Sequence, residues 1–182
     1  MAELGAGFVS GFVPGLIGEI ASLHARFYGA GWGFGRGFEA SVATDVAAFA
    51  QRYDPARDRV LSAWRGGRLI GTVTMDGAPE EIPDEVEGAP MQLRWFIVAE
   101  SAQGSGLGRR LMDAALRFSE EAGPRPVVLH TMAGLDRARA LYEARGFRLI
   151  AEAEAVRMGE RQMKQTFWRP TGDAPYEPSR SV

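Results

Sequence analysis

The chain has 182 residues, of which 46% are hydrophobic and 24% charged, the balance of a soluble globular domain with one hydrophobic core. Its formal net charge of -2 gives no basic excess for a polyanion, so we expect no nucleic acid partner. It contains no cysteine, which excludes disulfides, zinc thiolate sites and a cysteine nucleophile, and we expect no bound metal.

The amino-terminal residues do not have the pattern of a secretory signal, which needs basic residues before a continuous apolar run. Glu3 comes first here, and glycines interrupt the mildly apolar segment that follows. No stretch approaches the roughly 18 consecutive apolar residues of a membrane helix. We therefore expect a cytoplasmic protein that does not associate with a membrane.

The first third of the chain predicts a short strand and two helices. Residues 8–13 read as a strand that Pro14-Gly15 stops, and apolar residues then recur at helical spacing until about Tyr28. In residues 29–38 glycine alternates with bulky residues, and because glycine is a poor helix former we predict a loop there. A second helix is predicted near residues 38–53.

The middle of the chain predicts a hairpin and then a long connection. Strands at residues 60–64 and 69–75 flank Gly66-Gly67, a pair that favours a tight turn. Residues 76–90 are rich in proline, glycine and acidic side chains, which predicts a solvated loop that would attract a cation.

The last part of the chain alternates strands with helices. Strands are predicted at residues 92–99, 126–132, 147–156 and 162–168, and helices at residues 108–121 and 136–145. This order predicts a single α/β (α+β) domain over residues 1–169, with a mixed central sheet and flanking helices. Residues 170–182, rich in proline, glycine and serine, are expected to form a disordered tail.

A glycine-rich segment lies where the strand at residues 92–99 gives way to a helix. It consists of Gln103, Gly104, Ser105, Gly106, Leu107 and Gly108, and Arg109 and Arg110 follow. The glycines allow a ligand to approach the backbone, and the first amides of the helix have no partner within it. The segment therefore predicts an anion site suited to a pyrophosphate, with the two arginines at its rim.

Two other phosphate-binding patterns do not fit this segment. A Walker A loop needs Gly-Lys-Ser/Thr, whereas Leu107 and Arg109 follow the glycines here. A dinucleotide fingerprint needs a third glycine where this chain has Arg109 or Leu111. What remains is the pattern Gln/Arg-x-x-Gly-x-Gly/Ala, or a tight connection that binds no ligand.

Two blocks resemble the GNAT (general control N-acetyltransferase-related) superfamily. The first runs from Leu93 to Leu111 and contains the glycine segment, and the second is Ala138-Arg139-Ala140-Leu141-Tyr142-Glu143-Ala144-Arg145-Gly146-Phe147. The resemblance covers about residues 60–169. Residues 34–49 are similar to GNAT domains fused to MarR-type regulators, although we expect no helix-turn-helix domain in this chain.

The resemblance implies acetyl-coenzyme A as cofactor. Phe96, Ile97 and Val98 occupy the strand that pairs with pantetheine in the family, and the amides from Gln103 to Arg109 would hold the pyrophosphate. Tyr142 matches the tyrosine that protonates the leaving thiolate; as a phenol it is protonated at neutral pH, but it is also consistent with a core position. Leu135 replaces the asparagine of many members, so one polar contact to the cofactor is missing.

The general base and the acceptor pocket are less defined. Glu39 and His130 are the two candidate bases, and each also fits a structural role, as a helix-cap carboxylate and as a core histidine. His24 fits a helix surface or core position. Trp32, Phe34 and Phe38 predict an apolar wall for the acceptor, in a segment of residues 31–39 that folds over the acyl group; alternatively, Trp32 and Phe34 cap the core.

The resulting hypothesis is an N-acyltransferase that moves an acetyl group from acetyl-coenzyme A to a primary amine by direct attack. The alternative is a non-catalytic acyl-coenzyme A-binding sensor or partner module, and a DNA-binding regulator is disfavoured by the charge. The acceptor is left open between small amines, amino acids, antibiotics and protein termini. A homodimer is compatible with the resemblance.

Overall fold

The computed structural model describes residues 3–4, 8–80, 82, 86, 89–157 and 160–171. In these residues eight strands form one sheet in the order β1-β2-β3-β4-β5-β6-β8-β7. The strands are β1 (Glu3–Leu4), β2 (Phe8–Ser10), β3 (Arg59–Arg65), β4 (Arg68–Asp76), β5 (Met91–Val98), β6 (Val127–Met132), β7 (Arg148–Arg157) and β8 (Glu160–Arg169). The helices are α1 (Leu16–Trp32), α2 (Arg36–Arg52), α3 (Leu107–Glu121) and α4 (Asp136–Glu143), with a short 3-10 helix η1 (Glu100–Ala102).

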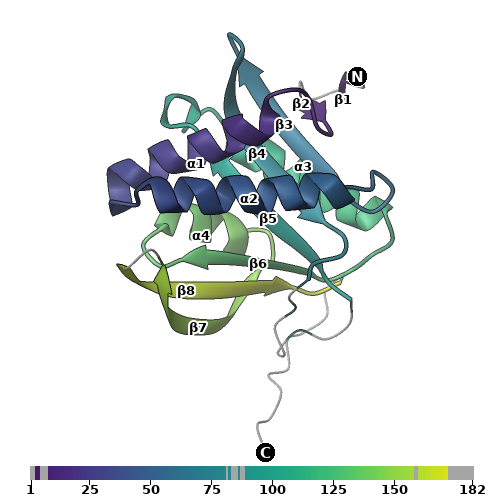
Figure 1. Cartoon of the computed structure of the whole chain (residues 1–182). Coiled ribbons are helices and arrows are strands. Elements are labelled where there is room, and N and C mark those ends of the chain that lie inside the picture. Colours follow the sequence, from purple (N-terminus) through teal and green to yellow (C-terminus); the bar gives the residue numbers. More distant parts are fainter. Residues whose placement is uncertain are drawn as a thin grey trace, which may run out of the picture.

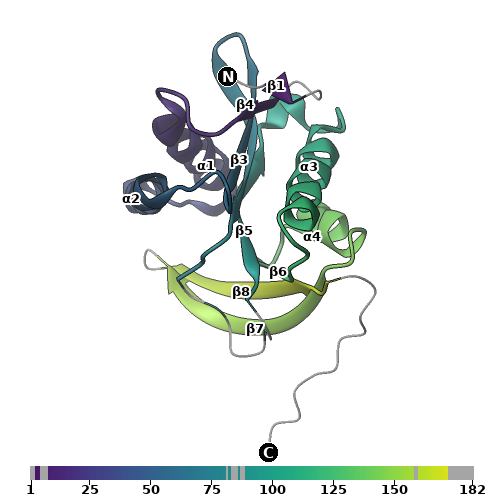
Figure 2. The ribbon, with the colours of Figure 1, turned by 90° about the vertical axis from the view of Figure 1, so that its right-hand side faces the viewer.

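Helices cover both faces of the sheet. α1 and α2 lie on one face and α3 and α4 on the other (Figures 1 and 2). Each face has its own apolar core, with Ile20, Val46 and Phe49 on the α1–α2 side and Leu111 and Phe167 on the α3–α4 side. The predicted single domain with a mixed sheet and flanking helices is thereby confirmed.

The sheet is mixed because one of its strand pairs is parallel. β5 and β6 run in the same direction, and the other neighbouring strands pair antiparallel. A parallel pair needs a crossover, and η1 and α3 provide it between β5 and β6. The carboxyl end of β5 therefore leads directly into the glycine-rich segment.

The two amino-terminal helices are longer than predicted. α1 continues to Trp32 and α2 begins at Arg36, so the prediction of a loop over residues 29–38 is wrong except for residues 33–35. The Tyr28 ring lies 6.1 Å from the Phe34 ring and 5.2 Å from the Phe38 ring between centroids. A Cβ on Gly29 would lie 3.3 Å from the Phe34 carbonyl oxygen. Packing of these rings outweighs the poor helix propensity of glycine.

The helix after the glycine-rich segment packs closely on β4. Its apolar side chains Leu107 and Leu111 meet the strand at Gly71, where a Cβ would lie 3.0 Å from Leu111 Cδ1 and 3.1 Å from Leu107 Cδ2. The missing side chain thus allows close approach of α3 to the sheet. This contact fixes the first turn of α3 beside the end of β5.

The connection after β4 begins with a buried carboxylate. Asp76 is fully buried and accepts hydrogen bonds from Arg52 Nη1 at 3.0 Å and from Arg94 Nη1 at 3.1 Å, which ties α2 to β4 and β5. Glu80 lies 3.9 Å from Arg52 Nε. The other acidic residues of the predicted solvated loop are Glu81, Asp84, Glu85 and Glu87, and they lie outside the described residues. The predicted disordered tail lies outside them from residue 172 onward.

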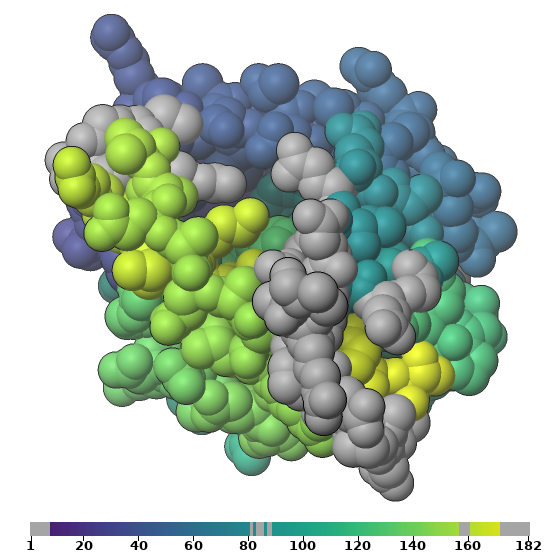
Figure 3. Space-filling view, turned by 90° about the horizontal axis from the view of Figure 1, so that it is seen from below, coloured from purple at the N-terminus to yellow at the C-terminus, as the bar shows by residue number. Residues whose placement is uncertain are grey.

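The last two strands form a long antiparallel pair at one end of the sheet. β8 pairs with β6 on one side and with β7 on the other. Seen from below, β7 and β8 cover much of the surface beside the α1–α2 layer (Figure 3). Among the helices in the described ranges, none is both long and apolar enough to cross a membrane.

Candidate functional site

The two parallel strands at the centre of the sheet separate toward their carboxyl ends. β5 and β6 pair only from Met91 with Val127 to Leu93 with Leu129, although both strands continue beyond these residues. Trp95 has a φ of 46°, an uncommon conformation for a bulky residue, and the pairing of β4 with β5 shifts register at this point. The separation opens a cavity of about 810 Å³.

The glycine-rich segment forms one end of this cavity. Gly104 and Gly106 adopt left-handed φ angles of 77° and 80°, and α3 begins at Leu107. A Cβ on Gly104 would meet no atom within 4 Å, so this backbone is open to a ligand. Of the predicted cofactor residues, those that line the cavity are Phe96, Ile97, Val98, Gln103, Gly104, Gly106, Leu107, Gly108 and Arg109.

Ser105 is the one residue of the segment that does not line the cavity. Its Oγ donates a hydrogen bond to the Ala102 carbonyl at 2.6 Å and accepts one from the Leu107 amide at 3.4 Å. Ser105 therefore supports the turn from within the chain. The structure assigns it a role in holding the loop shape, which leaves the first amides of α3 directed outward from the helix end.

The cations near the loop differ from those expected at its rim. Arg109 lines the cavity, but the exposed Arg110 does not, and its guanidinium lies over the Phe8 ring at 5.2 Å from the ring centroid. Arg137, in the first turn of α4, lines the cavity and donates a hydrogen bond to Gln103 Oε1 at 3.3 Å. Sequence reasoning missed Arg137 because only the fold brings α4 beside the loop.

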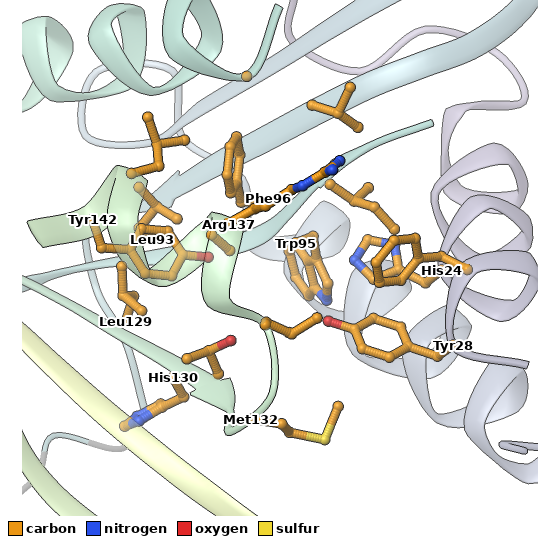
Figure 4. Close-up of a pocket in the computed structure, with 18 of the residues that line it drawn as sticks. His24, Tyr28, Leu93, Trp95, Phe96, Leu129, His130, Met132, Arg137 and Tyr142 are labelled. Atoms are coloured by element: carbon orange, nitrogen blue, oxygen red, sulfur yellow. The ribbon is translucent and has the colours of Figure 1, made fainter. Parts of the chain in front are cut away.

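Tyr142 lies on α4 with its side chain in the opening between β5 and β6 (Figure 4). Burial, and to a smaller extent the nearby Tyr28 phenol, raise the pKa of Tyr142 well above its usual range, whereas a hydrogen bond with the Thr131 side chain acts to lower it. The ring packs against Phe96 and Phe167 at centroid distances of 6.1 and 5.8 Å. Tyr142 is therefore a neutral phenol held rigidly beside the cavity.

The structure brings one of the two predicted bases to the cavity. His130 lines it, and its Nδ1 lies 3.0 Å from Thr166 Oγ1 on the neighbouring strand β8. Glu39 is exposed on the first turn of α2 and is not among the residues that line the cavity. Its neighbour Phe38 points inward, and consecutive helix positions differ by about 100°, so Glu39 faces solvent.

The structure brings one of the three predicted aromatic residues to the cavity. Phe38 lines the cavity, but Phe34 is buried in the core of the α1–α2 side, and Trp32 packs against that core next to Gly134. The aromatic residues that line the cavity with Phe38 are Phe27, Tyr28 and Trp95, and Figure 4 shows Tyr28 and Trp95. The four-residue spacing of His24 and Tyr28 indicates one helix face and was the signal available in the sequence.

His24 also lines the cavity, from the inner face of α1. Its Nδ1 lies 2.8 Å from the Ile20 carbonyl oxygen, which can only accept a hydrogen bond. Burial lowers the pKa of His24 to about 4, although that backbone hydrogen bond acts to raise it. The imidazole is therefore neutral at physiological pH with its proton on Nδ1, and Nε2 is left as an acceptor.

These groups divide the cavity into two parts. The loop, Arg109 and Arg137 form a cationic end, and His24, Tyr28, Phe38 and Trp95 form an aromatic end on the α1–α2 side. Tyr142 lines the cavity where the strands separate. Chemically, the arrangement suits a reaction between a phosphorylated carrier and a second molecule, with a proton donor in the same cavity.

Comparison with known proteins gives one family match and one curated relative. The sequence model of the acetyltransferase (GNAT) family matches residues 19–147. Over 104 residues, 57% of this chain, the sequence is 33% identical to the Mus musculus protein named "Probable N-acetyltransferase family 8 member 5". That stretch is 44% of the mouse protein, so the match spans less than half the length of this relative.

Solved structures share the fold. A protein from Salmonella typhimurium, solved with its cofactor acetyl-CoA, superposes with a TM-score of 0.67 at 14% identity, over 96% of this chain and 99% of that one. An acyl-CoA N-acyltransferase from Pseudomonas aeruginosa gives a TM-score of 0.63 at 17% identity, over 89% and 98% of the two chains. At these identities the likeness concerns the fold.

Proposed function

Because the chain belongs to the acetyltransferase (GNAT) family, we propose that it moves an acetyl group from acetyl-coenzyme A to a primary amine by direct attack. The family resemblance predicted from the sequence is confirmed by this match. The observation that carries the finer proposal is one cavity that joins the glycine-rich segment, the separated end of β5 and Tyr142.

The residues present fit acetyl-coenzyme A. The open backbone at Gly104 and Gly106, the first amides of α3 and the side chains of Arg109 and Arg137 suit a pyrophosphate. The edge of β5 that β6 leaves unpaired suits the amide groups of a pantetheine arm. Leu135 lines the cavity and supplies no polar side chain there, so backbone groups would make more of the polar contacts to the cofactor.

Acetyl-coenzyme A would supply the acetyl group as a thioester, from which an amine takes the acyl carbon and releases the thiol. The chain's own residues have two tasks at the thioester. Backbone amides of β5 stabilise negative charge on the acyl oxygen. The Tyr142 hydroxyl holds a proton for the departing sulfur, and the burial of its ring fixes the position of that hydroxyl.

The acceptor amine must lose a proton during the reaction. Of the two bases predicted from the sequence, only His130 lines the cavity, so we retain His130 and no longer assign this role to Glu39. The Nδ1 contact with Thr166 fixes the ring orientation. Transfer through a water molecule would connect His130 to the amine.

The apolar side chain of Leu135 in the cavity supports a second candidate function, a non-catalytic acyl-coenzyme A-binding module. Such a module would bind the cofactor and release no thiol with any amine. A homodimer, a cytoplasmic location and a kinship with GNAT domains fused to MarR-type regulators stay predictions from the sequence.

The experiment for cofactor binding is calorimetric titration of the protein with acetyl-coenzyme A. Gly106→Trp should abolish binding, because its side chain would occupy the loop. Gly67→Trp is the matched control, since Gly67 also has a left-handed φ with open space around it but lies in the turn between β3 and β4. Absence of binding to the unaltered protein at about millimolar ligand would contradict the proposal.

A further inference from the structure

Two opposite charges line the cavity. Asp45 on α2 and Lys164 on β8 both line it. Within the part of the chain that the structure describes, neither of them takes part in an ion pair. A cavity that keeps a carboxylate on one wall and an ammonium on another is complementary to a ligand that carries both charges.

Lys164 is distinctive in the sequence as well as in the fold. It is the only lysine among the 21 lysines and arginines of the chain. Lys164 pairs in register with Met132 of β6 and Ala153 of β7. Because side chains alternate along a strand, its neighbour Arg161 points to the opposite face. A compact ammonium suits a single carboxylate on a small ligand.

Aromatic side chains from α1, α2 and β5 line the same cavity. Phe27 and Tyr28 come from α1, Phe38 from α2 and Trp95 from the bulged part of β5. The Tyr28 and Phe38 rings meet edge to face with a centroid distance of 5.2 Å. This lining favours a flat apolar group on the ligand.

Two polar side chains of the helix wall present hydrogen-bond acceptors to the cavity. His24 Nδ1 contacts the Ile20 carbonyl, so its Nε2 is an acceptor, and the Asp45 carboxylate accepts as well. No lysine or arginine of α1 or α2 is among the residues that line the cavity. A group rich in N–H donors therefore fits this wall, and an amine is such a group.

We propose, on the basis of the proposed acetyl transfer, that the acceptor is a free amino acid with an aromatic side chain. Its carboxylate pairs with Lys164, its amino group faces His24 and Asp45, and its ring lies among Phe27, Tyr28, Phe38 and Trp95.

The chemistry of this step balances with acetyl-coenzyme A as the co-reactant. The ammonium first loses one proton to solvent, and the neutral nitrogen then forms a bond to the acetyl carbon as the carbon–sulfur bond breaks. The sulfur leaves with the electron pair and takes a proton from Tyr142. The nitrogen gives up one further proton through His130 to solvent, and Tyr142 regains a proton from solvent. The products are an N-acetyl amino acid and a thiol.

The test compares thiol release with L-phenylalanine and with phenethylamine, which keeps the ring and the amine but lacks the carboxylate. We expect kcat/KM for L-phenylalanine to be higher by about tenfold or more, and Lys164→Gln to remove that preference while changing the value for phenethylamine by less than about twofold. Arg161→Gln is the matched control, because it removes a cation from the other face of β8 and should retain the preference. Melting temperature and acetyl-coenzyme A affinity are measured for each variant.

Two results would overturn the inference and leave the proposed acetyl transfer standing. One is an equal kcat/KM for phenethylamine and for L-phenylalanine with the unaltered protein, a comparison that needs no variant. The other is an equal loss on both substrates in folded Lys164→Gln. Bound acetyl-coenzyme A without thiol release from any amine in a broad panel would instead contradict the proposed function, and the inference with it.

Discussion

Tyr142 on α4 and Thr131, the residue next to His130 on β6, both line the cavity where β5 and β6 have already separated, since the pairing of these strands ends at Leu93 and Leu129. A hydrogen bond with the Thr131 side chain acts to lower the pKa of Tyr142, against the larger effect of burial. The two hydroxyls therefore have separate measurable consequences.

Removal of the Tyr142 hydroxyl should affect turnover far more than cofactor binding. We expect Tyr142→Phe to lower kcat by about 10 to 10⁴-fold, the range for loss of a general acid, because the ring and its packing are kept. Acetyl-coenzyme A affinity by calorimetry should change little. Unchanged kcat in a folded variant would assign Tyr142 to packing or show that the chemical step does not limit the rate.

Thr131 should act on the reaction through Tyr142. Its hydrogen bond opposes the rise in the pKa of Tyr142, so Thr131→Val should raise that pKa further and weaken the acid. We expect kcat to fall by about two- to tenfold, which corresponds to the net free energy of one hydrogen bond. Thr131→Ser keeps a hydroxyl and should restore kcat; a serine variant as slow as the valine variant would point to packing.

His24 should make the protein less stable in mild acid. Its pKa is about 4 in the folded state, below the ordinary value of 6.5, so between these values the unfolded chain binds a proton that the folded protein does not. The free energy of unfolding should therefore decrease as pH falls from about 6.5 to about 4, by a total of about 3 kcal/mol. Denaturant titrations of the unaltered protein and of His24→Gln should diverge over this range, and parallel profiles would contradict the burial of a neutral imidazole.

Arg137 should contribute to cofactor affinity without taking part in the chemical step. Arg137→Gln removes a cation at the loop end of the cavity, and we expect acetyl-coenzyme A to bind about three- to tenfold more weakly. Arg139→Gln is the control on the same helix, because Arg139 pairs with Glu143 at 2.8 Å on the exposed face. Equal losses in the two variants would show a general charge effect.

The sequence was sufficient for the order of most elements and for the glycine-rich segment, because those features depend on local patterns. Short apolar runs mark β5 and β6, and the spaced glycines mark the turn into α3. The separation of the two strands was beyond sequence reasoning, since it depends on the left-handed conformation of Trp95 and on pairing between distant residues. The burial of Phe34 and the exposure of Glu39 also depend on the tertiary packing of α1 and α2, which the local pattern of glycines and aromatic residues does not specify.

The most direct test of the central claim is amine-dependent release of thiol from acetyl-coenzyme A, measured across a broad panel of primary amines with mass spectrometry of the products. The account predicts thiol release that requires both the protein and an amine, with a matching amount of product heavier by one acetyl group. It also predicts that Tyr142→Phe slows that release. A protein that binds acetyl-coenzyme A but gives no amine-dependent thiol release with any member of the panel would contradict the claim and identify the chain as a binding module.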